Sequence, residues 1–387
     1  MTSEMTDPTG SSPLSDPTAV HAADSSGDAY LRVEDLSVSF PTRDGLVKAV
    51  SGLSYSVELG RTLGIVGESG SGKSVSSMAV MGLHEPNRTN ISGSIQLDET
   101  EVVGLPETRM RRLRGNAAAM IFQDPLTALH PFFTIGSQIV EAYRTHNPDV
   151  SKRQAKAKAV EMLERVGIPQ PNRRIDDFPH QFSGGMRQRA MIAMALVNDP
   201  KLLIADEPTT ALDVTVQAQI LDLLQELQRD FGSAIIIITH DLGVVAEMAD
   251  DVLVMYGGRC VEYGAGKEIL THPEMPYTWG LLNSVPDLKG DVDAELNPIP
   301  GAPPSLLNLP QGCAFSPRCA YKHLVPGEVC DTQLPELTPG GRGPSHLKRC
   351  HLRDPEDVLR GEEPQPPTEL EDAALDAHDD EAEGDGQ

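Results

Sequence analysis

The stretch "TLGIVGESGSGKS" at residues 62–74 sets the architecture of the chain. Its apolar start, "TLGIVG" at 62–67, predicts a short apolar strand, and "VSSMAVMGL" after Ser74 predicts a helix. The glycine-rich loop between them fits the pattern G-x-x-x-x-G-K-[ST] through Gly67, Gly72, Lys73 and Ser74. In such a loop the backbone N–H groups curl around phosphates, and the helix N-terminus adds positive potential. The order strand, loop and helix therefore predicts a nucleoside-triphosphate site.

Each position of this loop has an expected role. Lys73 can reach the β- and γ-phosphates, and the Ser74 hydroxyl can ligate Mg²⁺. The predicted contacts to ATP from this segment are Gly67, Glu68, Ser69, Gly70, Ser71, Gly72, Lys73, Ser74 and Val75.

Further apolar strands alternate with amphipathic helices along the chain. Strands are predicted in "AAAMIFQDP", "LLIADEP" and "AIIIITHD", and helices in "MRQRAMIAMALV" and "VQAQILDLLQELQRDFG". Residues 151–167 predict another helix, with a capping box formed by Ser151 and Gln154. This alternation predicts an α/β fold with a mainly parallel sheet and helices on both faces.

Polar side chains follow three of the predicted strands. Asp206 and Glu207 end "LLIADE", where burial of two acids would be costly without a function. Asp206 suits contact with Mg²⁺ through water, and Glu207 suits polarising the attacking water. Gln123 can sense Mg²⁺ and the γ-phosphate, and His240 can hold the γ-phosphate and that water. A lone Gln or His is usually structural, so the roles predicted for Gln123 and His240 depend on the other motifs being present.

These motifs, taken in order with "SGG" at 183–185 and "ALD" at 211–213, resemble the ATP-binding subunit of ABC transporters over about residues 30–265. The resemblance implies a P-loop NTPase with a helical signature subdomain at about 124–195. It also implies two such domains paired head to tail, so that Ser183, Gly184 and Gly185 contact ATP in the partner's site. Asp213 would act across the interface. Phe40 either packs on adenine or belongs to the core.

Three longer segments resemble the ATPases of oligopeptide and dipeptide permeases: "IFQDPLTALHP" at 121–131, "ADEPTTALDVTVQAQI" at 205–220 and "HPEMPYTWGLLNSVP" at 272–286. That branch includes nickel importers, so the solute stays open. The resemblance implies four partners: a second ATPase (paralogue or copy), two transmembrane permease subunits and, indirectly, an extracytoplasmic solute-binding protein. It implies a peripheral location on the cytoplasmic face of the membrane, with the segment from Gln123 to about 145 receiving the coupling helix.

Four of the five cysteines lie near the C-terminus, at Cys313, Cys319, Cys330 and Cys350. Their spacing lacks a CxxC pair and so does not match common zinc fingers. It resembles the C-terminal module of peptide-permease ATPases, some of which bind a [4Fe–4S] cluster. A cluster, Zn²⁺ and unmetallated thiols are the three alternatives, and any metal here would be structural.

Charge and composition predict the domain organisation. Of the net charge of −25, residues 1–28 carry −5 and residues 354–387 carry −13, which leaves −7 for the body. We expect a disordered extension at 1–28, an ATPase domain at 29–265, a small C-terminal domain at 266–353 and an acidic disordered tail at 354–387. No apolar run is long enough for a membrane span, and no signal peptide is recognisable.

Other function classes fit less well. The acidity and the lack of aromatics in the arginine run "RMRRLRG" argue against nucleic-acid binding. A GTPase switch would need an N-K-x-D motif to recognise the base, which this sequence lacks, and would leave the "SGG" segment unexplained. A soluble ABC-type ATPase of translation or DNA repair usually carries two ATPase domains or a coiled-coil insertion, neither of which this sequence shows.

Overall fold

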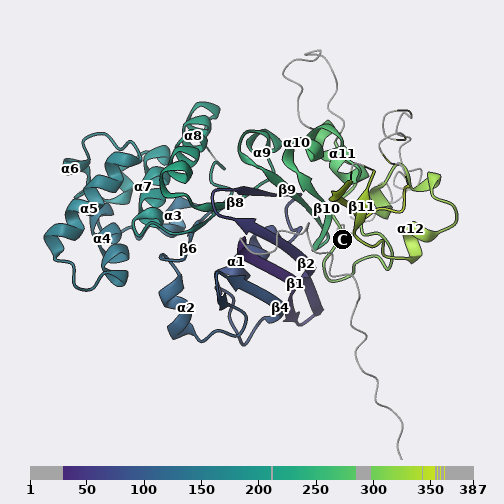
Figure 1. Ribbon diagram of the computed structural model, residues 1–387, viewed down its shortest axis with the longest axis horizontal. Coiled ribbons are helices and arrows are strands. Elements are labelled where there is room, and N and C mark those ends of the chain that lie inside the picture. The colour runs from purple at the N-terminus through teal and green to yellow at the C-terminus, as the bar shows by residue number, and fades with distance from the viewer. Residues whose placement is uncertain are drawn as a thin grey trace, which may run out of the picture.

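The computed structural model describes residues 29–210, 212–284, 298–341 and 343–353, together with Pro355, Val358 and Gly361. The predicted disordered extension at 1–28 and most of the acidic tail lie outside this range. Two sheets form the middle of an elongated molecule, with a group of helices at one end and the C-terminal residues at the other (Figure 1).

The larger sheet has eight strands in the order β11-β12-β10-β9-β3-β8-β7-β6. The five strands from β9 to the edge strand β6 are parallel, as the alternation of strands and helices predicted. Every residue of β3, β7 and β8 is buried, which explains their continuous apolar runs. The parallel strands are β3 (Thr62–Val66), β6 (Ala118–Ile121), β7 (Leu202–Asp206), β8 (Ala234–Thr239) and β9 (Asp251–Tyr256).

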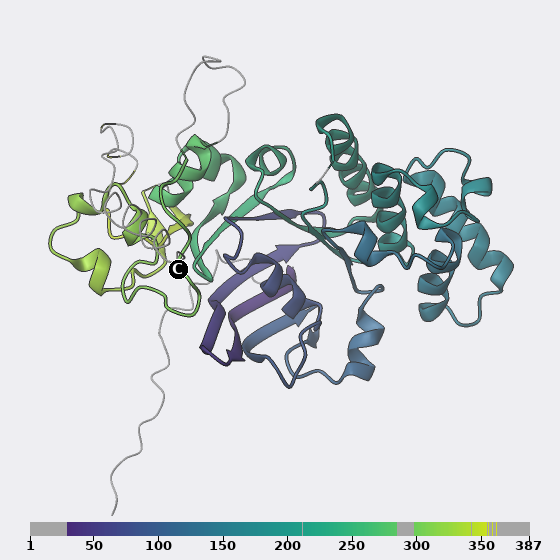
Figure 2. The same cartoon turned by 180° about the vertical axis from the view of Figure 1, so that it is seen from behind.

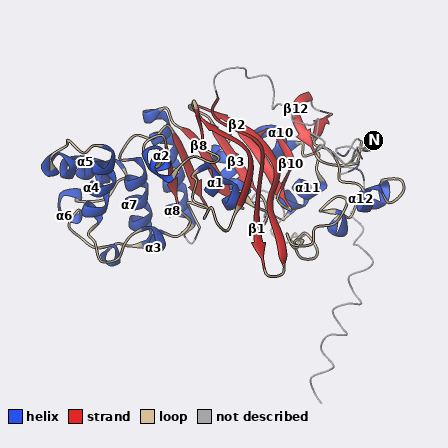
Figure 3. Cartoon of the chain, turned by 90° about the horizontal axis from the view of Figure 1, so that it is seen from below, coloured by secondary structure: helices blue, strands red, loops and turns tan. Residues whose placement is uncertain are grey.

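The smaller sheet is antiparallel, with the order β2-β1-β4-β5. Helix α1 (Lys73–Val80) contributes buried side chains to a core that both sheets share, so the helix after the glycine-rich loop is held between them. Figure 3 shows the long strands of this sheet beside the parallel strands. Its members are β1 (Ala29–Thr42), β2 (Gly45–Glu58), β4 (Asn90–Leu97) and β5 (Thr100–Glu101).

The helical end of the molecule lies beyond β6 and is seen from both sides in Figures 1 and 2. The predicted helix at 151–167 is α5 (Lys152–Arg165), and its capping box of Ser151 and Gln154 is present. Its neighbours are α3 (Pro125–Ala128), α4 (Ile135–His146), α6 (Pro171–Arg174), η1 (Pro179–Gln181) and α7 (Gly184–Leu196). Two more helices flank the parallel strands, α8 (Val214–Phe231) and α9 (Leu242–Met248).

The C-terminal residues join the large sheet. Strand β12 (Gly343–Lys348) pairs antiparallel with β10 (Arg259–Ala265), with Glu262 opposite Lys348. The segment for which the sequence predicts a small domain thus adds strands β12 and β11 to the large sheet, next to β10. The other elements here are α10 (Gly266–Thr271), α11 (Pro276–Asn283), η2 (Ser316–Arg318), η3 (Lys322–Leu324), α12 (Val329–Thr332) and β11 (Thr338–Gly340).

The arginine run forms α2 (Glu107–Leu113) and its C-cap. Arg111 and Arg114 pair with Glu107, and Arg114 also donates to two backbone carbonyls, so the run is a mostly solvated helix face with one anchoring residue. Among the described residues, none of the helices has both the length and the apolar character needed to cross a membrane.

Candidate nucleotide-binding site

The loop between β3 and α1 needs glycine at two positions. Gly67 has φ +148°, and an added Cβ would lie 2.2 Å from the carbonyl oxygen of Met255. Gly72 has φ +103°, and its Cβ would lie 2.3 Å from the carbonyl oxygen of Ala49. Neither position can accept a side chain without moving backbone from β9 or β2. The loop is therefore shaped by the strands around it, which is the property a phosphate cradle requires.

Lys73 lies inside this loop and is almost completely buried. Its Nζ donates to the carbonyl oxygen of Gly67 at 2.6 Å and to that of Glu68 at 3.0 Å. Burial lowers the pKa of the ammonium group, while the carboxylates of Glu207, Asp206 and Glu68 oppose that shift. The charge of Lys73 is thus directed toward the loop and the acids at the same sheet edge.

Ser74 and Asp206 join the glycine-rich loop to the end of β7. The Ser74 hydroxyl donates to Asp206 Oδ1 over 3.1 Å, although the two residues are 132 positions apart. Burial raises the pKa of the Asp206 carboxyl, while its hydrogen bond with Ser74 lowers it. A hydroxyl and a carboxylate side by side are the oxygen ligands that suit Mg²⁺. The donor set and the glycine cradle together fit Mg²⁺ and a nucleotide phosphate.

Glu207 is the centre of a hydrogen-bonded group at the same edge. Gln123 donates to Glu207 Oε2 over 2.7 Å, and the Thr210 hydroxyl donates to the same oxygen over 2.9 Å. The Nδ1 atom of His240 lies 3.4 Å from Glu207 Oε1. Glu207 has φ +47°, a strained backbone for a residue with a side chain, and such strain is concentrated at functional sites. The three predicted catalytic residues therefore meet, and Thr210 is a member that sequence reasoning missed.

Phe40 lies on β1, a strand of the smaller sheet. It is partly buried against the core, and its ring meets the ring of His84 edge-on at 5.6 Å between centroids. His84 in turn bonds the carbonyl oxygen of Val75, the residue that follows the phosphate loop. His84 was not predicted, because no motif or periodicity singles it out. The ring pair leaves both earlier interpretations of Phe40, adenine contact and core residue, as predictions.

The "SGG" segment lies at the start of α7 in the helical part of the molecule, whereas the glycine-rich loop precedes α1. Ser183 caps α7 by accepting a hydrogen bond from the Met186 N–H at 3.3 Å, and Gly184 is open on its Cβ side. Helix α7 packs against α3, α4, α5 and β6, whereas α1 packs against β1 and β2. Asp213 caps α8 in the same manner, bonding the Val216 N–H at 3.0 Å, and is exposed.

The segment after Gln123 presents large apolar side chains to solvent. The side chains of Leu126, Phe132 and Phe133 are 62%, 80% and 54% exposed. We call these three residues the apolar surface of the helical subdomain. They lie between β6 and α4, close in sequence to the glutamine that bonds Glu207.

The four C-terminal cysteines line one small cavity of about 20 Å³, together with Phe315, Tyr321 and Leu352. Burial raises the pKa of each thiol, to about 11 for Cys330 and about 12 for Cys350. The fold thus gathers Cys313, Cys319, Cys330 and Cys350, as a shared role requires. Among the described residues, however, no three His, Cys, Asp or Glu side chains are arranged to hold one metal ion. The cavity has room for little more than a water molecule, so the expected [4Fe–4S] cluster is not supported by this arrangement.

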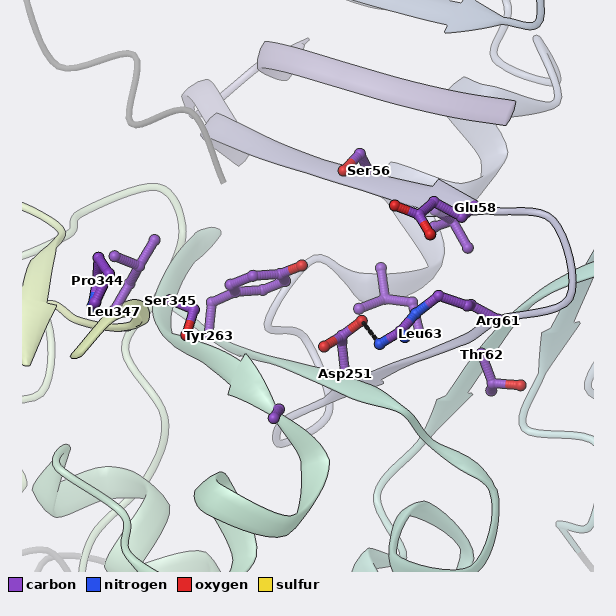
Figure 4. A pocket seen from close by; sticks show the side chains of 12 residues that line it. Ser56, Glu58, Arg61, Thr62, Leu63, Asp251, Tyr263, Pro344, Ser345 and Leu347 are labelled. Carbon is purple, nitrogen blue, oxygen red and sulfur yellow. Dashed lines mark hydrogen bonds and ion pairs between the residues drawn. The ribbon is translucent and has the colours of Figure 1, made fainter. Parts of the chain in front are cut away.

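A larger cavity of about 260 Å³ lies at the other end of β3 (Figure 4). Its wall includes Tyr263 and the ion pair between Arg61 and Asp251, which are 2.8 Å apart. Thr62 and Leu63 place it at the amino end of that strand. Ligands of open parallel sheets bind at the carboxyl ends of the strands, where Lys73 and Glu207 lie. None of the predicted site residues lines this cavity, so it is distinct from the candidate nucleotide site.

Comparison with known proteins agrees with this geometry. A family model described as ABC transporter matches residues 50–210, and one described as the C-terminal region of oligopeptide/dipeptide transporters matches residues 261–324. Among solved structures, cbiO1 from Clostridium perfringens, described as part of the ABC transporter complex cbiONQ, is 30% identical with a TM-score of 0.53. The match covers 63% of this chain and 91% of that one.

Curated relatives are more similar still. The oligopeptide transport ATP-binding protein OppD of Escherichia coli (strain K12) is 51% identical over 83% of this chain and 94% of its own length. The dipeptide transport ATP-binding protein DppD of Bacillus subtilis (strain 168) is 50% identical over 84% of this chain and 96% of its own length. Because such relatives are about half identical over most of its length, the chain belongs to the ABC-transporter ATP-binding proteins, in the family of the oligopeptide and dipeptide transport ATPases.

Proposed function

We propose that this chain is the ATP-hydrolysing subunit of a membrane importer for oligopeptides or dipeptides. The observation that carries the proposal is the group around Glu207, which lies beside Lys73, Ser74 and Asp206 at one sheet edge. Relatives that are about half identical over most of their length are oligopeptide and dipeptide transport ATP-binding proteins, which favours peptides as the solute. An importer of nickel or another small solute of the same branch is the alternative, and a soluble ABC-type ATPase is less well supported.

The residues at the sheet edge would have different roles in ATP binding and hydrolysis. The backbone N–H groups of the loop from Gly67 and the Lys73 ammonium would bind the phosphates, and Ser74, Asp206 and Gln123 would hold Mg²⁺. Bound Mg²⁺ supplies positive charge against the phosphate oxygens. The Glu207 carboxylate would orient and polarise the attacking water, with His240 beside it at the γ-phosphate. Gln123 and Thr210 keep Glu207 in one place, which is what positioning of a water requires.

The signature segment supports a second ATPase subunit as partner. Ser183, Gly184 and Gly185 open a helix of thirteen residues whose N-terminus attracts anions. Helix α7 packs in the helical subdomain, whereas α1, which follows the phosphate loop, packs against β1 and β2. The N-terminus of α7 would therefore bind the phosphate that is held by the loop of another chain. Asp213 would lie at the same interface. The second ATPase is either a copy of this chain or a paralogue.

Two substitutions test the catalytic assignment. Lys73→Ala removes the buried ammonium, and we expect it to abolish ATP binding. Glu207→Gln keeps the shape and one acceptor oxygen but removes the charge, so ATP binding should persist while turnover falls about 100-fold or more. The Glu207→Gln form should accumulate as an ATP-bound dimer in size-exclusion chromatography. Glu226→Gln, the same change on the exposed side of α8, serves as the control and should leave turnover unchanged. Normal ATPase rates in the Glu207→Gln form would contradict the mechanism.

We propose that the coupling helix of one transmembrane permease subunit docks on the apolar surface formed by Leu126, Phe132 and Phe133, and that the transporter contains two such permease subunits. Large apolar side chains that are exposed next to one another in this way are typical of a protein–protein interaction site. The surface starts at Leu126, three residues after Gln123, so a docked helix could shift the glutamine that bonds Glu207. A solute-binding protein outside the membrane would take part indirectly, and this chain would be peripheral on the cytoplasmic face.

Polar replacement of the apolar surface separates docking from hydrolysis. The double variant Phe132→Ser, Phe133→Ser removes two exposed rings without touching the catalytic group. We expect at least a tenfold loss of co-purification with the permease subunits, with the ATPase rate of the isolated chain within twofold of the original. Leu46→Ser, a comparable exposed position on β2, should keep both properties. Unchanged co-purification of the double variant would disprove this docking surface.

The C-terminal segment is proposed as a domain at residues 266–353, attached to an ATPase domain at 29–265 with a helical subdomain at about 124–195. We further propose that its four cysteines share one structural role, either as the ligands of a metal centre, a [4Fe–4S] cluster or Zn²⁺, or as unmetallated thiols. Four thiols at one cavity in a short, proline-rich segment are the supporting observation. Such a centre would act by stabilising the segment.

Metal analysis tests this centre directly. Protein purified without oxygen should contain about four iron atoms and four sulfides per chain if a cluster is present, or one zinc otherwise. Cys319→Ser should abolish the metal content and lower the unfolding temperature, whereas Cys260→Ser, which changes a buried cysteine outside the cavity, should keep the metal. Metal-free protein with an unchanged unfolding temperature in Cys319→Ser would show that the thiols are unmetallated.

A further inference from the structure

A residue of the C-terminal segment reaches the glycine-rich loop. Arg318, at the end of η2, forms a bidentate ion pair with Glu68, the second residue of the loop, over 2.6 Å and 2.9 Å. The two residues are 250 positions apart. The Arg318 side chain is only 4% exposed and that of Glu68 is 24% exposed, so the pair is largely shielded from water. A paired charge at this depth interacts more strongly than a surface salt bridge.

The guanidinium group of Arg318 has a partner for each of its five N–H donors. Besides the two bonds to Glu68, Nη1 donates to the Tyr256 hydroxyl, Nη2 to the carbonyl oxygen of Ile299 and Nε to that of Pro300. These partners fix the plane of the guanidinium from three sides. A side chain held in this way presents its two remaining donors to Glu68 in one orientation, at little further entropy cost.

Glu68 itself is held at every polar group. Its N–H donates to the Tyr277 hydroxyl at 2.7 Å, its carbonyl oxygen accepts from Lys73, and its carboxylate accepts from Arg318. Tyr277 belongs to α11, so two of these three partners come from the C-terminal segment. The rings of Tyr256, Tyr277 and Phe315 contact one another, and Tyr256 and Tyr277 bond Arg318 and Glu68 through their hydroxyls. The loop that is expected to bind phosphate is therefore braced from outside the ATPase part of the sequence.

We propose that Arg318 is a positioning residue for ATP binding: it fixes Glu68, and through it the first turn of the phosphate loop, and it neutralises a carboxylate that would otherwise face the phosphates. This inference rests on the proposed phosphate-binding role of residues 67–75. The C-terminal segment thus supports the nucleotide site of its own chain. Because the contact acts on the loop and not on Glu207, it should change the affinity for ATP and leave the hydrolytic step largely alone.

Steady-state ATPase kinetics and ATP titration of the full chain test the proposal. Arg318→Met should raise KM and Kd for ATP about tenfold, the size expected for one lost charge-assisted contact, with kcat within twofold. Arg318→Lys should recover part of the affinity, because it restores the charge but not the bidentate geometry. Adding Glu68→Gln to Arg318→Met should also recover part of the affinity, because the unpaired carboxylate is then removed.

The matched control is Arg349→Met. Arg349 also anchors the C-terminal segment, donating to the carbonyl oxygens of Cys260 and Pro335, and neither of these acceptors belongs to the glycine-rich loop. A purely structural role for Arg318 predicts a lower unfolding temperature with KM unchanged in the folded fraction, as in Arg349→Met, and that result would overturn the proposal. Failure of the underlying site is distinguishable, since Lys73→Ala would then bind ATP normally, whereas failure of this inference alone leaves Lys73→Ala inactive and Arg318→Met unaffected.

Discussion

The parallel pairing of β3 with β8 and of β8 with β7 is the constraint on which the site depends. In that register Val66 lies beside Thr239 and Asp206 lies beside Ile238, so all three strands end at the same edge. Whatever follows each strand is brought together there: the glycine-rich loop, the acid pair and His240. The strands are buried on both faces, and a shift of register would expose apolar residues and separate these groups.

Burial of Asp206 and Lys73 at that edge is costly, and the surrounding contacts explain why the fold tolerates it. The Lys73 ammonium donates to two loop carbonyls and lies near three acids, so two of its three N–H groups are partnered and its charge is offset. The Asp206 carboxylate accepts a hydrogen bond from the Ser74 hydroxyl, and the Glu207 carboxylate accepts hydrogen bonds from Gln123 and Thr210. The same hydrogen bonds that satisfy buried charge also hold each group in the place that binding and hydrolysis need.

Local patterns predicted much of this molecule because its main signals are local. The glycine pattern, the apolar runs and the capping box of Ser151 and Gln154 each specify a short segment, and the parallel sheet follows from their alternation. Thr210 and His84 escaped because they act through neighbours that only the fold supplies. The contact between Glu68 and Arg318 joins residues 250 positions apart, and no periodicity reports such a pair. The cysteines are an intermediate case, since the sequence left a cluster, Zn²⁺ and unmetallated thiols open, and only the fold shows that all four line one small cavity.

The central claim is that this chain drives a transporter, and one affinity purification tests it most directly. The Glu207→Gln form, with ATP and Mg²⁺, would be isolated from membranes of its source cells and its bound proteins identified by mass spectrometry. The account predicts two transmembrane permease subunits and a second ATPase in comparable amounts, and the identity of the accompanying solute-binding protein would separate peptides from nickel. Recovery of ribosomal or DNA-bound proteins, with no membrane subunit, would contradict the account.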